Sequence, residues 1–311
     1  SMHRYSKSRP TLFRSLLFYN ARASLAIVLF ICCITWCAAV EYGCEHVLQQ
    51  AKGQLDAWQH SGFIVLRSFM SPALITACHR YLDKVIWAAD RKQRPPETIG
   101  IVPPPGEFVM NSYFNFRDVD ARVRSEAYRL LLPERVPGPA PWKGLVADPC
   151  IFAVVQALIG TRVGHMNGIL FERGSQQDLH SDTWYGLAGL EPGRMVGVWF
   201  AMDSVDDDNG PLLYLPGSHH GIGGALSNLT VQNRRYRSIT YHKARKHLPY
   251  AVPFYARAGD VFFWHERLLH GAAPIRNWTK TRLSIVMHYR DGFAPQRRGD
   301  TPLAAAQTPP N

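Results

Sequence analysis

The chain has 311 residues, of which 46% are hydrophobic and 19% are charged. This composition excludes an intrinsically disordered protein, which is poor in apolar residues, and it supplies one large core, as in barrel domains of about 250 residues. The formal net charge is +11. A basic balance alone does not indicate nucleic acid as a partner, and no recognised nucleic-acid-binding module accompanies it.

Residues 1–45 differ in character from the remainder. Five lysine or arginine residues and no acidic residue precede Glu41, and residues 24–40 are largely apolar and uncharged. Basic residues ahead of such a run are typical of a signal anchor, a signal peptide or an organellar transit peptide. Residues 1–45 are therefore predicted to be a targeting or membrane-anchor segment, with the protein at a membrane or in an endomembrane or organellar lumen. The cytoplasm is the alternative if the segment has no such role.

Three of the six cysteines lie inside the apolar run, and the others are Cys44, Cys78 and Cys150. An odd number at such scattered spacing predicts neither a disulfide framework nor a zinc ribbon. Two Asn-x-Thr triplets begin at Asn228 and Asn277. They are acceptors for an N-linked glycan only if the chain enters a secretory lumen.

Residues 46–295 are predicted to form one domain, followed by an Ala- and Pro-rich flexible tail at 296–311. Residues 71–90 have apolar positions at helical spacing after a Ser-Pro start. Short β-prone runs between turn residues follow at 196–202, 212–215, 261–264 and 283–287. Repeated short strands of this kind favour a sandwich or barrel over βαβ units.

His180-Ser181-Asp182, together with the distant His270, carries the chemistry. Two imidazoles and one carboxylate form the facial triad that holds a metal such as Fe(II) and leaves positions open for substrate and oxygen. Alternate residues of a strand point to the same side, so we expect His180 and Asp182 on one strand and His270 on a second. The odd spacing of five predicts that His265 faces away from this site.

Several further motifs surround these residues in a fixed order. They are 171–185 around the metal pair, 197–202, 209–212, 216–219, 259–261, 270–272 and Arg282. Together they resemble the phytanoyl-CoA dioxygenase family of Fe(II)/2-oxoglutarate-dependent oxygenases, which includes ectoine hydroxylases, and the similarity runs from about Leu55 to Tyr289. The resemblance implies a mainly β protein with flanking helices, folded as a double-stranded β-helix (jelly roll) around one metal. It also matches 58–66 to the family's opening helix end and first strand.

The same resemblance implies Fe(II), 2-oxoglutarate and O2 as cofactors, with His180, Asp182 and His270 as the catalytic metal ligands. The implied reaction is hydroxylation of a small molecule, with decarboxylation of 2-oxoglutarate to succinate. Related halogenases have a small residue in place of the acid, so Asp182 favours hydroxylation over halogenation.

Arg282 lies where the family anchors 2-oxoglutarate, and a guanidinium fork pairs bidentately with a carboxylate. A surface arginine is the alternative. Ser284 would add a hydroxyl contact, and Trp199 would line the cosubstrate pocket; each is as consistent with a core residue.

Four residues near the metal pair are predicted to contact substrate: Trp184 and Tyr185 after it, and Arg173 and Gln177 on the incoming strand. Plain packing is the competing interpretation. Residues 110–116 and the basic insert 234–246 are the candidate lid. The insert would attract an anionic substrate, unless it is only a solvated loop.

Two positions depart from the family pattern. Members often carry Gln where Ser181 stands, and Ser or Gly where Ala272 stands. Both differences remove polar contacts to 2-oxoglutarate and leave the metal ligands intact. They keep open a non-enzymatic jelly-roll protein that binds a metal or ligand, and the triad is also compatible with a catalytic zinc site. The sequence does not indicate an oligomeric state.

Overall fold

The computed structural model describes residues 43–86, 100–102, 114–115, 129–131, 139–185, 193–226 and 237–292. Within these ranges, no helix combines the length and the apolar character that a membrane crossing requires. The apolar run 24–40, the tail 296–311 and most of the candidate lid 110–116 lie outside the described residues.

The described helices lie mainly in the first half of the chain. They are α2 (Glu45–Lys52), α3 (Leu55–Ser61), α4 (Pro72–Tyr81), α5 (Lys143–Val146), α6 (Pro149–Ile159) and α8 (Arg237–Arg245), with a π-helix at Leu82–Ile86 and 3-10 helices at Asp182–Tyr185 and Leu248–Tyr250. α4 begins as predicted, because the Ser71 hydroxyl accepts a hydrogen bond from Leu74 N and proline occupies the first turn. Asp148 caps α6 in the same way.

Two antiparallel sheets form the body of the protein. The large sheet has the order β1-β9-β6-β11-β5-β4-β2-β3 and the small sheet the order β10-β7-β8. The strands are β1 (Phe63–Leu66), β2 (Gly100–Val102), β3 (Phe114–Asn115), β4 (Arg129–Leu131), β5 (Val163–Phe171), β6 (Met195–Ala201), β7 (Leu212–Tyr214), β8 (Val252–Phe254), β9 (Val261–His265), β10 (His270–Ala272) and β11 (Ser284–Asp291). Strands far apart in the sequence are neighbours, and the fold is the predicted double-stranded β-helix.

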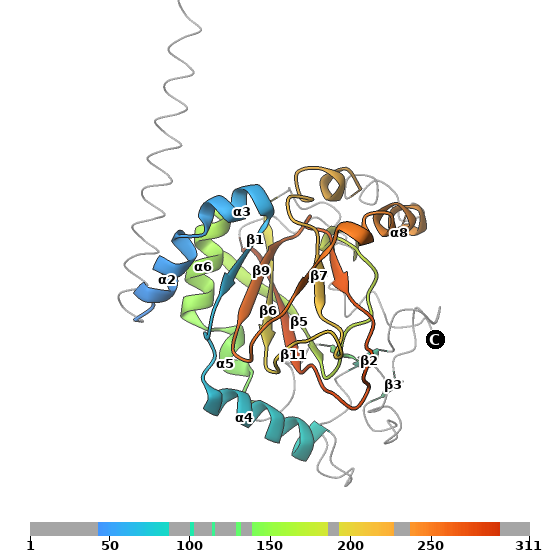
Figure 1. The fold of residues 1–311 in the computed structure, drawn as a ribbon. Helices are drawn as coiled ribbons and strands as arrows, with labels where there is room; N and C mark the ends of the chain where they lie inside the picture. Colours follow the sequence, from blue (N-terminus) through green and yellow to red (C-terminus); the bar gives the residue numbers. More distant parts are fainter. Residues whose placement is uncertain are drawn as a thin grey trace, which may run out of the picture.

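Alternate residues of the central strands serve two different cores. On β6, Val196, Val198 and Phe200 join the core beneath α2 and α6, whereas Trp199 and Ala201 join the core between the two sheets. Figure 1 shows α2, α3 and α6 on one side of the large sheet and β7 on the other. β6 is buried along its whole length, and both faces of this strand are apolar. A polar side chain between the sheets is therefore an exception.

The predicted strands at 196–202, 212–215, 261–264 and 283–287 are confirmed within a residue or two, with β11 extending to Asp291. The turn at 206–210 does not join paired strands, because β6 belongs to the large sheet and β7 to the small one. The chain therefore changes sheets in this turn. Asn209 organises it by donating through Nδ2 to Ser204 O and Thr281 O, both at 3.0 Å.

The cysteine spacing predicted no disulfide framework, and the structure corrects this prediction with one disulfide. Cys44 and Cys150 form a disulfide that joins the start of α2 to the first turn of α6 across 106 residues, and Cys78 is a buried free thiol. The two half-cystines meet because α2 and α6 pack together on the large sheet. Spacing along the chain carries no trace of that contact, so counting cysteines could not find it.

Candidate metal centre

His180 and His270 face each other across two short backbone segments. His180 N donates to His270 O at 2.8 Å, and His270 N donates to His180 O at 2.9 Å. An antiparallel pair bonded in both directions places its two side chains on the same face, and the ring centroids are 4.4 Å apart. Gly271 permits this approach, because a Cβ there would lie 2.8 Å from the carbonyl oxygen of Gln177. The backbone itself thus brings the two imidazoles together.

Both rings direct the same nitrogen toward Asp182. Nδ1 of His180 lies 2.7 Å from the carbonyl oxygen of Asp178, and Nδ1 of His270 lies 3.0 Å from that of Leu268. A carbonyl only accepts, so each Nδ1 carries a proton, and Nε2 of the neutral ring keeps its lone pair for a metal.

The Nε2 atoms of His180 and His270 lie 4.0 and 3.5 Å from Oδ1 of Asp182. The three side chains supply ligand atoms within 4.8 Å of one another, and all three are buried. Two ligands of one ion at about 2.1 Å are at most about 4.2 Å apart. Both nitrogen–oxygen distances, 4.0 and 3.5 Å, lie within this limit, so the three side chains are suited to binding one divalent metal ion.

Asp182 does not share a strand with His180, contrary to the expectation. β5 ends at Phe171, His180 forms an isolated bridge with His270, and Asp182 begins a 3-10 helix. The hydroxyl of Ser181 donates to Glu266 O at 2.8 Å and lies 2.7 Å from the Thr183 hydroxyl. Ser181 therefore stabilises this turn, and the turn brings the Asp182 carboxylate toward the imidazoles.

The second oxygen of Asp182 is held by two residues that sequence reasoning missed. Nε1 of Trp264 donates to Oδ2 at 2.6 Å, and Nε2 of His288 lies 3.5 Å from the same atom. Burial would raise the pKa of Asp182, but attraction to the surrounding imidazoles in their protonated form, led by His270, outweighs burial and keeps that pKa below its usual value. Asp182 is therefore a carboxylate with one oxygen occupied and the other facing the histidines. Inward alternation along β9 and β11 was the signal that could have identified Trp264 and His288.

Arg282 is a buried cation whose guanidinium is only partly satisfied. Its side chain is 2% exposed, Nη1 donates to Gly210 O at 2.7 Å, and Nε has no hydrogen-bond partner among the described residues. Burial lowers the pKa of Arg282 to about 10, so the group stays protonated near neutrality. A buried cation without a carboxylate beside it is costly, and this donor set fits an incoming carboxylate.

The other two predicted cosubstrate residues lie close to Arg282. The Trp199 ring centroid is 5.6 Å from the Arg282 guanidinium carbon. Ser284, the first residue of β11, is fully buried, and its hydroxyl has no partner within the part of the chain that the structure describes. Arg282 and Ser284 thus each have a buried polar atom without a hydrogen-bond partner among the described residues, and their contacts with 2-oxoglutarate stay predictions.

Two of the four residues predicted to contact substrate do not lie on the element where the sequence predicts them. Arg173 and Gln177 lie beyond the end of β5 rather than on an incoming strand, and the Arg173 guanidinium donates to Trp278 O and to Lys280 O. Gln177 O accepts from Ala272 N at 2.9 Å, so its backbone supports β10. Trp184 and Tyr185 complete the 3-10 helix that Asp182 begins. Their substrate contacts stay predictions.

His265 lies apart from the triad. His265 packs against Trp58 and His219, with ring centroids 5.8 and 5.0 Å away, on the helix side of the sheet. Burial lowers the pKa of His265 to about 3 and that of His165 to about 4, which keeps both rings neutral.

The basic insert contacts the edge of the site, because Arg245 of α8 forms an ion pair with Asp178 at 2.7 Å.

Comparisons with known proteins agree with this geometry. The sequence model of the family described as phytanoyl-CoA dioxygenase (PhyH) matches residues 58–282. The peroxisomal phytanoyl-CoA dioxygenase of Bos taurus is 23% identical over 257 residues, which are 76% of this chain and 68% of that protein. The Mus musculus protein of the same description is 28% identical over 45% of this chain, and the match spans 43% of its length.

Solved structures show the same fold. The non-haem alpha-ketoglutarate-dependent carbocyclase SnoK from nogalamycin biosynthesis is 19% identical, with a TM-score of 0.56 over 83% of this chain and 91% of that chain. HygX from Streptomyces hygroscopicus, solved with nickel and 2-oxoglutarate bound, is 15% identical, with a TM-score of 0.51 over 79% of this chain and 89% of that chain.

Proposed function

We propose that this chain, which belongs to the phytanoyl-CoA dioxygenase family of Fe(II)/2-oxoglutarate-dependent oxygenases, hydroxylates a small molecule and decarboxylates 2-oxoglutarate to succinate in the same turnover. The observation that carries the proposal is the convergence of His180, Asp182 and His270 within 4.8 Å, beside the orphaned guanidinium nitrogen of Arg282.

The residues of this chain would bind the metal ion, orient the cosubstrate and shield the reacting groups from water. Fe(II) and 2-oxoglutarate, when bound, supply the chemistry that activates O2. His180 and His270 donate neutral Nε2 lone pairs, and Asp182 contributes a negative charge through Oδ1. Three such ligands would hold Fe(II) from one side and would leave coordination positions for cosubstrate and oxygen.

Arg282 orients the cosubstrate. Its fork supplies paired donors for the distal carboxylate of 2-oxoglutarate, and Ser284 adds a hydroxyl donor. Because Arg282 is buried, its attraction for a carboxylate is weakly screened by water. The aromatic core between the sheets, including Trp199, limits water around the reacting groups.

We infer that the substrate is a small molecule, and that an anionic one would be favoured. The support is the basic helix α8, which is tied to Asp178, two residues before the metal ligand His180. Its positive charge would raise the local concentration of an anionic substrate at low ionic strength.

The test is succinate release from 2-oxoglutarate under Fe(II) and O2, with small-molecule extracts screened by mass spectrometry for the gain of one oxygen. Wild type is expected to release succinate, faster with its substrate, and His180→Ala and Asp182→Ala to lose the activity. Asp56→Ala, which removes an exposed carboxylate of α3, is the matched control and should behave as wild type. Equal release from wild type and Asp182→Ala would contradict the proposal.

A further inference from the structure

The loop at 276–281, between β10 and β11, presents an Asn-x-Thr triplet at the surface. Oδ1 of Asn277 accepts from Thr279 N at 3.0 Å and from the Thr279 hydroxyl at 2.6 Å. Nδ2 of Asn277 has no hydrogen-bond partner among the described residues. Trp278 is 44% exposed, and Thr279 is exposed as well. Asn277 itself is half-buried, and its Nδ2, which no contact within the described residues uses, lies beside these exposed side chains.

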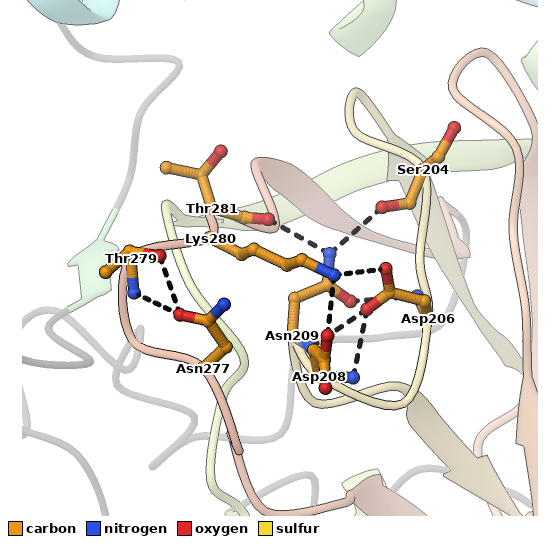
Figure 2. A network of polar contacts seen from close by, with 8 residues as sticks. All are labelled: Ser204, Asp206, Asp208, Asn209, Asn277, Thr279, Lys280 and Thr281. Carbon is orange, nitrogen blue, oxygen red and sulfur yellow. Dashed lines mark hydrogen bonds and ion pairs between the residues drawn. The ribbon is translucent and has the colours of Figure 1, made fainter.

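The loop is held from its other side. Nζ of Lys280 forms ion pairs with Asp206 at 2.8 Å and Asp208 at 2.7 Å, and Asn277 N donates to Asp208 O at 2.9 Å. Figure 2 shows the contacts of Lys280 and those of Asn209 gathered on one side of the loop, with none of the drawn contacts reaching Nδ2 of Asn277. A group attached to Nδ2 would therefore break none of the bonds that hold the loop.

The disulfide of this chain indicates the cellular compartment in which the domain lies. The Cys44–Cys150 disulfide is a bond that persists in oxidising compartments and is rare in the cytosol. Cys44 follows the apolar run 24–40 and the basic residues that precede it, the pattern of a segment that directs a chain into a lumen. Disulfide and leader-like sequence point to the same compartment, and that compartment is where Asn-x-Thr triplets are modified.

We propose that Asn277 is an N-glycosylation site of a domain that lies in the lumen of the secretory pathway. Nδ2 of Asn277 forms a bond to the anomeric carbon of an oligosaccharide carried on a polyprenyl diphosphate. The bond from that carbon to the diphosphate oxygen breaks, Nδ2 loses one proton, and the lipid diphosphate leaves with the electron pair. The inference is independent of the proposed oxygenase activity.

The experiment uses the full chain, residues 1–42 included, expressed in a eukaryotic cell. Asn228→Gln removes the other triplet, which lies outside the described residues, so that a mobility shift on treatment with peptide-N-glycosidase reports Asn277 alone. In that background, Thr279→Ser keeps the triplet and the hydroxyl that bonds Oδ1 of Asn277, whereas Thr279→Ala destroys the triplet and removes that hydroxyl. Peptide mapping without reductant shows whether Cys44 and Cys150 are linked.

The expected result is a shift of one glycan in Asn228→Gln and in Asn228→Gln/Thr279→Ser, none in Asn228→Gln/Thr279→Ala, and a linked Cys44–Cys150 peptide in all of them. An Asn228→Gln protein that does not respond to the glycosidase would overturn the site, whatever the state of the cysteines. A shift that survives Thr279→Ala would overturn it as well, because the glycan would then be elsewhere.

Discussion

The indole of Trp264 donates a hydrogen bond to Oδ2 of Asp182 at 2.6 Å, entirely within the core. Gly197 on the neighbouring strand β6 leaves room for this ring, since a Cβ there would lie 2.2 Å from it. The bond occupies the oxygen of Asp182 that faces away from His180 and His270. It therefore orients the carboxylate so that Oδ1 remains for the metal, a role that partners of metal-ligating groups often have.

Trp264→Phe is predicted to weaken Fe(II) binding by about tenfold to a hundredfold, because it removes the donor to Asp182 and keeps an aromatic ring. Anaerobic metal titration of the purified protein measures the effect. Trp142→Phe, a buried tryptophan in the helical layer, is the control and should bind Fe(II) as wild type does. Equal dissociation constants for Trp264→Phe and wild type would mean that the hydrogen bond does not position the ligand.

Arg282→Lys is predicted to raise the 2-oxoglutarate concentration for half-maximal activity by at least about tenfold. Lysine keeps the positive charge and loses the planar fork that pairs with both carboxylate oxygens. Steady-state kinetics at saturating Fe(II) separates this effect from metal binding. Arg276→Lys, at an exposed position of the preceding loop, should leave the value unchanged, and the assignment of Arg282 fails if the two variants behave alike.

Glu266→Gln is predicted to stabilise the protein above neutral pH. Burial raises the pKa of Glu266 to about 7, and only one of its oxygens, Oε1, has a hydrogen bond, from Gly193 N. The unfolded chain deprotonates near its ordinary pKa of about 4.5, so folding stability falls as pH rises from 4.5 to 7 and stays lowered above 7. Glutamine removes this cost, which is on the order of 3 kcal/mol at most.

Denaturant unfolding of Glu266→Gln and wild type at pH 5 and pH 8 checks the sign. The variant should gain more stability over wild type at pH 8 than at pH 5. Nδ1 of the neighbouring His265 lies 3.6 Å from Oε2 of Glu266, but burial lowers the pKa of His265 to about 3, so this ring does not titrate between pH 5 and pH 8. A stability difference that does not change with pH would show that Glu266 is not buried in its protonated form.

The Cys44–Cys150 disulfide closes a loop with a sequence separation of 106, and its removal is predicted to cost about 2–5 kcal/mol of unfolding free energy. Cys44→Ala/Cys150→Ala should therefore unfold at lower denaturant than wild type. A reductant should lower the stability of wild type and leave the double variant unchanged. A reductant effect of equal size in both proteins would exclude the disulfide as its origin.

Local patterns predicted much of the site's surroundings. The resemblance to a known family predicted that Arg282 and Trp199 belong to one pocket, and the Trp199 ring centroid lies 5.6 Å from the Arg282 guanidinium carbon. His180 and His270 also meet as expected. These features depend on residues a few positions apart, or on a pattern shared with a known family.

Other features depend on tertiary packing that no local pattern encodes. The 3-10 turn at Asp182 follows from the hydroxyl contacts of Ser181 with Thr183 and with Glu266, far along the chain. The disulfide follows from the docking of α2 on α6. The bond from Trp264 to Asp182 requires the absence of a side chain at Gly197.

The most direct test of the central claim is an anaerobic absorption titration with Fe(II) and 2-oxoglutarate. A pocket that holds Fe(II) through His180, Asp182 and His270 and places 2-oxoglutarate on the same ion is predicted to give a weak visible charge-transfer band that requires both additions and is lost in Asp182→Ala. A wild-type protein that shows no band, or a band that persists in Asp182→Ala, would contradict the account.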